Sequence, residues 1–165
     1  MKLTLTICIA ALAPSFGSVS AVTADDEARL AELDAYWAEV SRAVKAGDFE
    51  GYKATCHEEG VLVSGTKEQS QPLSDALARW KKDFAATKSG KLRATVEFRF
   101  SQRLNDRTTA HETGIFLYST IDSAGARQDE YIHFEGLLVK RGGKWKILME
   151  YQKSKASFEE LKALR

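Results

Sequence analysis

Features that would assign a chain to a specialised class are scarce in this sequence. It has two prolines, two cysteines and a formal net charge of +1 over 165 residues. So little proline, with an ordinary hydrophobic content of 44%, favours a compact globule the size of a single domain. A nearly neutral chain lacks the positive surface that attracts nucleic acids and acidic membranes, so neither is expected as a partner.

Long apolar runs are missing too. The run Leu3–Leu12 is too short to cross a bilayer, but it follows a single lysine and precedes the small residues Val19-Ser20-Ala21. This order is typical of a secretory signal peptide, in place of a buried N-terminal strand or helix. We therefore predict a signal peptide over residues 1–21, with cleavage after Ala24 as a second option. A single domain would follow over residues 22–165, and the protein would be exported, either periplasmic or secreted.

Cysteine is the third scarcity. Cleavage would remove Cys8 and leave Cys56 as the only thiol, so no disulfide could form within the domain. A single thiol in an oxidising compartment is more often a small buried apolar group than a nucleophile, and we expect Cys56 to be buried.

Motifs for nucleotides, metals and activated nucleophiles are absent as well. The sequence has no glycine loop that would cradle phosphates, no serine nucleophile elbow and no zinc-ligand spacing. His57 lies between Cys56 and Glu58, which are all metal-ligand types, but no helix-spaced partner supplies the remaining ligands. We therefore expect neither a metal nor a cofactor.

Apolar residues recur at helical spacing in two stretches. The first forms one face of an amphipathic helix that ends at Gly47, and the second begins at Pro72 and stops at Ser89-Gly90. A short helix starting at Asp48 and a C-terminal helix starting at Ser157 are also expected. The two apolar stripes are Leu30, Leu33, Trp37, Val40 and Val44, and Leu73, Leu77, Trp80 and Phe84.

Strands dominate the rest of the chain. The stretch Arg93–Lys155 predicts four long strands joined by three hairpins, after a short strand at Val61–Val63 and a polar loop. Asn105-Asp106, Ala124-Gly125 and Gly142-Gly143 are residue pairs that suit two-residue hairpin loops. Such loops fix the register, so the residues that flank them should pair. The expected pairs are Leu104 with Arg107, Ser123 with Ala126, and Arg141 with Lys144.

These registers sort the strand residues onto two faces, although a bulge would exchange the faces beyond it. The first face is almost wholly apolar, and the second mixes aromatic residues with acids. The first face comprises Val96, Phe98, Phe100, His111, Thr113, Ile115, Leu117, Ile132, Phe134, Gly136, Leu138, Trp145, Ile147, Met149 and Tyr151. The second comprises Thr95, Glu97, Arg99, Glu112, Gly114, Phe116, Tyr118, Tyr131, His133, Glu135, Leu137, Leu148, Glu150 and Gln152.

The order of elements is informative as a whole. Ala46–Phe49 follows the first helix, and Gly143–Ile147 enters the last strand of the meander. With these stretches, residues 24–156 resemble the nuclear-transport-factor-2-like (NTF2-like) superfamily, which includes SnoaL-like and ketosteroid-isomerase-like domains. The resemblance implies an α+β, cystatin-like fold: a cone-shaped curved antiparallel sheet wrapped around N-terminal helices. It also implies a pocket at the open end of the cone and, as in many members, a homodimer through the sheet face.

Function varies widely in this superfamily, so the fold alone does not determine the chemistry. Ketosteroid isomerase has its base just after the first short strand, where Val63–Thr66 holds no carboxylate, which argues against the same mechanism. Limonene epoxide hydrolase keeps an acid followed by a tyrosine in its last strand, and Leu148–Tyr151 is similar to that stretch. This similarity places Glu150 at the pocket acid. It implies that the mixed face is concave and the apolar face is left for a partner, whereas alternation alone would pack the apolar face on the helices.

The predicted register also sets Glu135 opposite Glu150, with His133 two residues from Glu135. Two adjacent carboxylates can share a proton, and a histidine beside them can relay one. The alternative is a pair of solvated glutamates and a structural histidine on an outer face. His111 is expected in the core or an interface.

Taken together, the sequence predicts an exported, dimeric domain that binds a small, partly apolar molecule. The alternatives are an isomerase, dehydratase or hydrolase that needs no cofactor, and an assembly module that works through the apolar sheet face. The candidate catalytic residues are Glu150, Glu135 and His133, and the candidate ligand-binding residues are Phe116, Tyr118, Tyr131, Leu137, Leu148, Gln152 and Trp37.

Overall fold

The helices and strands follow the order that the sequence predicts, with one additional strand. The computed structural model describes residues 24–164, and the predicted signal peptide, residues 1–21, lies outside the described residues. Between residues 24 and 164, no helix is long and apolar enough to cross a membrane. In chain order the elements are α1 (Ala24–Ala46), α2 (Phe49–Ala54), β1 (Cys56–Ser64), β2 (Gln69–Pro72), α3 (Leu73–Lys88), β3 (Leu92–Asn105), β4 (Thr109–Asp122), β5 (Arg127–Arg141), β6 (Lys144–Lys155) and α4 (Phe158–Ala163).

Helix α1 buries the stripe that its sequence spacing predicts. Leu33, Trp37 and Val44 are all buried, because residues three and four apart share one face of a helix. The helix ends at Gly47, whose φ of +63° is readily adopted only by glycine. A Cβ at this position would lie 2.4 Å from the backbone nitrogen of Lys88, so the glycine also lets the ends of α1 and α3 meet.

The other helices begin at the predicted residues. The Asp48 side chain caps α2 by accepting a hydrogen bond from the Gly51 amide at 2.9 Å. Pro72 occupies the N-cap of α3, one position before its first turn. Ser157 and Glu160 form the capping box of α4 that their spacing predicts.

The six strands form one open sheet in the order β2-β1-β6-β5-β4-β3. Strands β3 to β6 make the predicted antiparallel meander, while β1 pairs with β6 in parallel. The sheet is therefore mixed, where the sequence predicted an antiparallel one. The additional strand, β2, lies in the stretch predicted as a polar loop, and Pro72 is tolerated there because β2 is an edge strand.

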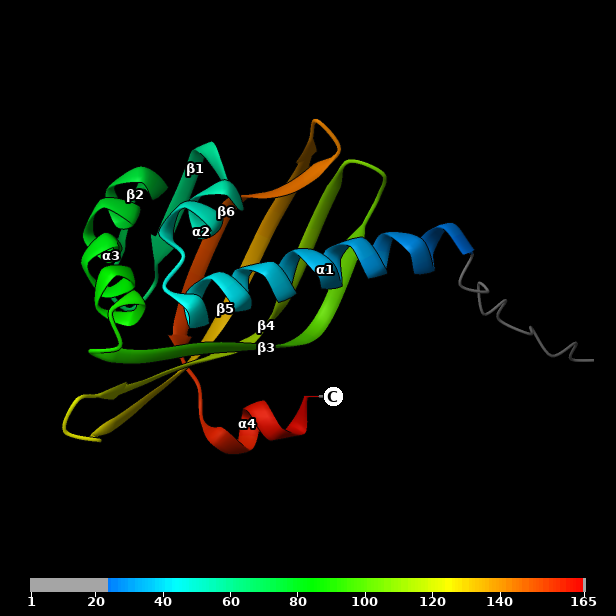
Figure 1. Ribbon diagram of the computed structural model, residues 1–165. Helices are drawn as coiled ribbons and strands as arrows, with labels where there is room; N and C mark the ends of the chain where they lie inside the picture. The colour runs from blue at the N-terminus through cyan, green and yellow to red at the C-terminus, as the bar shows by residue number, and fades with distance from the viewer. Residues whose placement is uncertain (1–23, 165) are drawn as a thin grey trace, which may run out of the picture.

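Helices α1 and α3 cover the concave face of the sheet, which carries Phe98, Phe116, Phe134 and Ile147 (Figure 1). The ring of Trp37 on α1 lies 4.4 Å from that of Phe98 and 5.7 Å from that of Phe134, measured between centroids. The interpretation that leaves the apolar face for a partner subunit is therefore wrong for Phe98, Phe134 and Ile147, since the chain's own helices cover these residues. The homodimer itself stays a prediction.

Two of the three hairpin loops are longer than predicted, so the predicted pairs Leu104–Arg107 and Ser123–Ala126 do not form. The first two predicted registers are shifted as a result, and a bulge between Phe100 and Gln102 shifts the pairing of β3 with β4 by one further residue. Residues from both predicted faces therefore share the concave face. Phe116, for example, pairs with Phe98 on one side and Ile132 on the other. The observed pairs that flank the loops are Asn105 with Ala110, Ile121 with Arg127 and, as predicted, Arg141 with Lys144.

The C-terminal segment folds back over the outer face of the sheet, which carries Ile115, Tyr131, His133 and Glu135 (Figure 1). The backbone amide of residue 156 donates to the Tyr131 carbonyl oxygen at 2.8 Å. Leu161 of α4 is only 3% exposed. The chain thus covers part of its own outer face.

Candidate functional site

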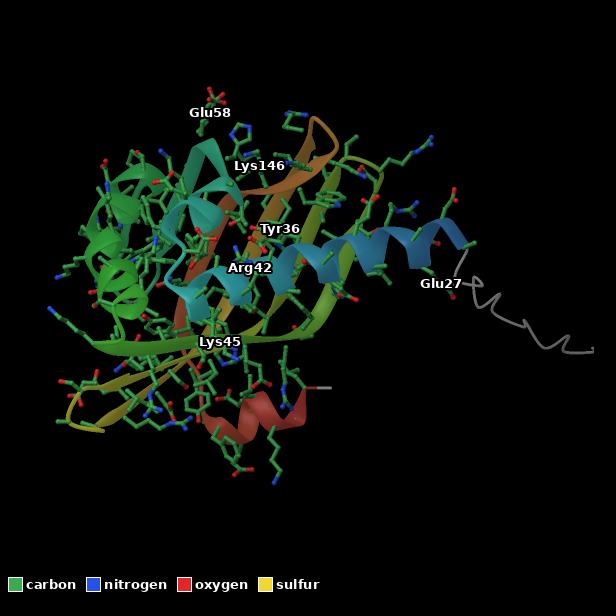
Figure 2. The ribbon with its side chains drawn as sticks, in the orientation of Figure 1. Glu27, Tyr36, Arg42, Lys45, Glu58 and Lys146 are labelled. Atoms are coloured by element: carbon green, nitrogen blue, oxygen red, sulfur yellow. The ribbon has the colours of Figure 1, made fainter. Side chains whose placement is uncertain are left out.

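A cavity of about 340 Å³ lies between α1, α3 and the concave face of the sheet. Figure 2 shows Tyr36 on the part of α1 that crosses the sheet, and this residue contributes to the wall. The size of the cavity and its largely aromatic wall suit a small organic molecule. The aromatic lining residues are Tyr36, Trp37, Tyr52, Trp80, Phe84, Phe98, Phe116, Tyr118 and Phe134.

A β-bulge in β6 turns Glu150 into this cavity. Ile147 and Met149 pair with neighbouring residues of β5, so Leu148 has no partner of its own. Strict alternation would put Glu150 on the face opposite Ile147. The extra residue brings both side chains to the cavity, because a bulge re-aims every side chain beyond it.

The Glu150 side chain has a single hydrogen-bond partner among the described residues. Gln152 Nε2 donates a hydrogen bond to Glu150 Oε1 at 2.7 Å, and no lysine, arginine or histidine in residues 24–164 forms an ion pair with the carboxyl. Burial raises the pKa of Glu150 above the usual 4.5, and the bond from Gln152 opposes this only in part. Glu150 is therefore a carboxyl group without a counter-charge, on the wall of a cavity.

Three titratable groups within electrostatic reach of Glu150 are uncharged near neutral pH. Burial, to which the charge of Glu150 adds, raises the pKa of Tyr36 and of Tyr52 well above 10. The same two causes raise the pKa of Cys56 to about 12. The Tyr36 hydroxyl donates to the Thr55 carbonyl oxygen at 3.3 Å, whereas the Tyr52 hydroxyl has no acceptor within residues 24–164. Tyr52 is thus a donor that a ligand can use.

A second acidic region lines the cavity beside β4 and β5. Burial raises the pKa of Tyr118, and the nearby carboxylates of Asp83 and Glu130 raise it further. Arg79 of α3 also lines the cavity, but it donates a hydrogen bond to Gln71 Oε1 at 2.8 Å and is exposed. The negative groups of the wall are therefore not neutralised by direct ion pairs within the described residues.

The sequence itself matches a known family over most of its length. The model of the calcium/calmodulin dependent protein kinase II association domain matches residues 29–157. The chain belongs to this family. No match was found among curated protein sequences.

Solved structures place this association-domain chain in a wider fold group. A ketosteroid isomerase-like protein from Erwinia carotovora atroseptica is 18% identical, with a TM-score of 0.57 over 78% of this chain and 97% of that one. An NTF-2 like protein from Shewanella oneidensis is 16% identical, with a TM-score of 0.57 over 74% and 97%. A structure from Xanthomonas campestris, described as an association domain of the same kinase, is 17% identical, with a TM-score of 0.52 over 86% and 90%. At these identities the similarity shows the fold alone, and it confirms the NTF2-like α+β cone expected from the sequence.

The residues predicted for the site divide between the two faces of the association domain. Those that line the cavity are Glu150, Phe116, Tyr118, Gln152 and Trp37. Those that do not are Glu135, His133, Tyr131, Leu137 and Leu148. Whether the first group binds a ligand stays a prediction.

The predicted pairing of Glu135 with Glu150 is wrong. Glu135 pairs with Tyr151, and Gly136 takes the place opposite Glu150. The predicted register is correct at the Gly142-Gly143 turn but ends at the bulge, which moves Met149 to Gln152 of β6 by one position. Glu135 and Glu150 therefore lie on opposite faces of the sheet.

On the outer face, the displaced residues form polar contacts of their own. Glu135 accepts a hydrogen bond from Lys153 Nζ at 2.7 Å and lies 3.3 Å from Nε2 of His111, which is thus neither in the core nor beside the cavity. His133 Nε2 lies 3.2 Å from Glu160 Oε1 of α4. These contacts fit the structural alternative for His133 and Glu135.

The sequence analysis missed several residues of the cavity wall, and one of them, Tyr36, could have been found from its helical spacing. Tyr36, Val40 and Val44 lie four residues apart and line the cavity together. Val40 and Val44 belong to the predicted stripe of α1, and their spacing adds Tyr36 to the same face. Asp83 and Glu130 have no such signal, because their place on the cavity depends on how α3 and β5 pack.

The cysteine and histidine of β1 lie outside this arrangement of wall residues. Cys56 is 6% exposed, which confirms its predicted burial. His57 Nδ1 accepts a hydrogen bond from the Glu59 amide at 3.2 Å. No group of His, Cys, Asp and Glu side chains in residues 24–164 is arranged to hold a metal ion.

Proposed function

We propose that this chain binds a small, partly apolar molecule in the cavity between α1, α3 and the sheet. The observation that carries the proposal is a half-buried carboxyl, that of Glu150, with no cationic partner among the described residues, set in a largely aromatic wall. Binding sites for small molecules commonly combine an apolar wall with a few convergent polar groups. Here those groups are Glu150, Gln152 and the Tyr52 hydroxyl.

A fluorescent probe tests whether the cavity takes up an apolar molecule. N-phenylnaphthylamine is uncharged near neutral pH and fluoresces more strongly in apolar surroundings. We expect saturable binding with one site per chain. Replacing Val96, which lines the cavity, by phenylalanine should fill that space and abolish the binding.

The matched control is Thr95→Phe, which adds a similar ring to the neighbouring, exposed position of β3. Adjacent strand residues face opposite sides of a sheet, so this variant should bind as the unaltered protein does. Thermal unfolding of both variants checks that they remain folded. Undiminished binding by Val96→Phe would place the probe elsewhere and count against the proposal.

Proton-transfer catalysis at Glu150 is a second candidate function. The raised pKa of Glu150 favours it, because a general acid or base works best when its pKa approaches the working pH. The predicted helpers Glu135 and His133 lie on the outer face, so Glu150 would act with Gln152 and Tyr52 instead.

Exchange of deuterium into an enolisable aromatic ketone such as β-tetralone tests this candidate. The protein in heavy water should accelerate exchange next to the carbonyl, as followed by NMR, and Glu150→Gln should remove the acceleration. Equal rates with and without the protein would leave binding as the only proposed role.

A further inference from the structure

We infer that the cavity selects an organic cation, meaning an amine or quaternary ammonium group on an apolar skeleton, and holds the cation against Glu150. This inference rests on the proposed function and adds the chemical class of the ligand. It follows from the charges and rings that line the wall.

The charges of the wall favour a positive ligand. Asp83, Glu130 and Glu150 contribute three carboxylates, and Lys67 and Arg79 contribute two cations. Glu130 and both cations are on exposed residues, so the two half-buried charges, Asp83 and Glu150, are both negative. Neither cation forms an ion pair with a carboxylate among the described residues. A ligand with a positive group would supply the missing counter-charge of Glu150, and an anion would add to the repulsion.

The rings of the wall suit the same ligand class. Tyr52 and Trp80 stand edge to face, with centroids 6.1 Å apart and planes at 83°, and Phe116 and Trp37 complete the wall toward the sheet. Aromatic faces attract ammonium groups, and more strongly where water is excluded. The uncharged Tyr52 hydroxyl adds a dipole without adding a charge.

A neutral ligand would not compensate the charge of Glu150. It would cover Glu150 and deepen the desolvation of the carboxylate without compensating its charge. Glu150 would then have to take up a proton. A cation avoids this step, because its own charge replaces the lost water.

Three ligands of one skeleton and different charge test the inference. Phenethylamine, phenethyl alcohol and phenylacetate are cationic, neutral and anionic near neutral pH. Isothermal titration calorimetry with the full chain should give an affinity for phenethylamine about tenfold above that for the alcohol, in line with a desolvated charge contact. Phenylacetate should bind least tightly. Glu150→Gln should bring the amine and the alcohol to equal affinity.

Glu97→Gln is the matched control, because Glu97 is a carboxylate on the opposite face of β3 that pairs with Arg99. It should leave the preference for the amine unchanged. An amine that binds no more tightly than the alcohol, or a preference that survives Glu150→Gln, overturns the inference. If N-phenylnaphthylamine still binds in the cavity, the proposed function stands without it. If neither that probe nor any of the three ligands binds, both proposals fail.

Discussion

Two glutamates on the concave face of the same sheet have very different neighbours. Glu112 on β4 is fully buried, and both the indole of Trp37 and the guanidinium of Arg103 donate hydrogen bonds to it. Arg103 also donates to Asp34 at 2.5 Å. Glu150 on β6 has only the neutral Gln152. The first carboxylate is compensated on each side, and the second is not.

The comparison distinguishes a carboxylate that stabilises the fold from one that remains able to bind a ligand or a proton. A buried charge is tolerated where ion pairing and hydrogen bonds replace its lost water, as they do around Glu112. Trp37 lies between the two regions: it lines the cavity and donates to Glu112. The Glu112–Arg103 ion pair therefore lies on one side of the Trp37 ring. On the other side, the carboxyl of Glu150 can bind a ligand or a proton.

Breaking the completed pair should have the largest effect. Glu112→Gln should lower the free energy of unfolding by about 3–5 kcal/mol, the usual cost of removing one partner from a buried ion pair. The charge of Arg103 would remain beside a neutral amide, and a guanidinium nitrogen of Arg103, Nη2, is already buried without a partner in residues 24–164. Urea unfolding followed by tryptophan fluorescence measures the loss.

Asp34→Asn is the control for that prediction, because it removes the other carboxylate that Arg103 contacts. The Asp34 side chain is 63% exposed, so its loss should cost less than about 1 kcal/mol. Similar losses in the two variants would mean that burial does not distinguish the two carboxylates.

Removing the charge of the uncompensated glutamate should have the opposite sign. Glu150→Gln should stabilise the fold near neutral pH, by on the order of 1 kcal/mol, because a partly desolvated carboxylate is replaced by a neutral amide. The folded pKa of Glu150 lies above the unfolded value, so its destabilising effect is full above the folded pKa and fades as the pH falls toward 4.5.

Unfolding free energies of the unaltered protein and of Glu150→Gln, measured at several pH values, test this sign. The gap between the two proteins should be widest near neutral pH and should close as the solution is acidified. A Glu150→Gln protein that is less stable than the unaltered protein near neutral pH would mean that Glu150 is compensated by a cation after all.

The parts of the fold that could be predicted depend on local chemistry. Gly142 and Gly143 adopt φ values of +56° and +76°, as a two-residue hairpin loop requires, so the pair Arg141–Lys144 followed from sequence. The helix stripes were predictable for the same reason, because each depends on residues a few positions apart.

The two hairpin loops whose length was predicted wrongly both begin with an aspartate, which is a local signal for a longer loop. Asp106 accepts hydrogen bonds from the amides of Thr108 and Thr109 at 2.7 and 2.8 Å, which favours a longer loop. Asp122 does the same for the amides of Ala124 and Ala126, both at 2.9 Å. An aspartate at the start of a turn therefore predicts more than two loop residues here.

The bulge that brings Glu150 to the cavity has no such signal. Leu148 lies in an ordinary apolar run, and nothing in its neighbours marks it as the unpaired residue. Bulges arise where a sheet must bend over its core, which depends on contacts between distant elements. The position of Glu150 on the cavity came from the family resemblance, while the position of Glu135 came from unbroken register and was wrong.

Glu135 gives the smallest expected effect and completes the comparison. Lys153 and, to a lesser extent, His111 hold the pKa of Glu135 below its usual 4.5, against the opposing effect of burial. Glu135→Gln should therefore destabilise the fold by less than about 1 kcal/mol, as expected for a pair near the surface. A folded pKa below the unfolded value means that this contribution is present above pH 4.5 and is lost as the pH falls through the folded pKa.

The stability changes caused by Glu135→Gln and by Glu150→Gln should thus have opposite signs near neutral pH, and both should shrink on acidification. Added salt should weaken only the Glu135 effect. Equal signs for the two variants would contradict the contrast between a compensated Glu135 and an uncompensated Glu150.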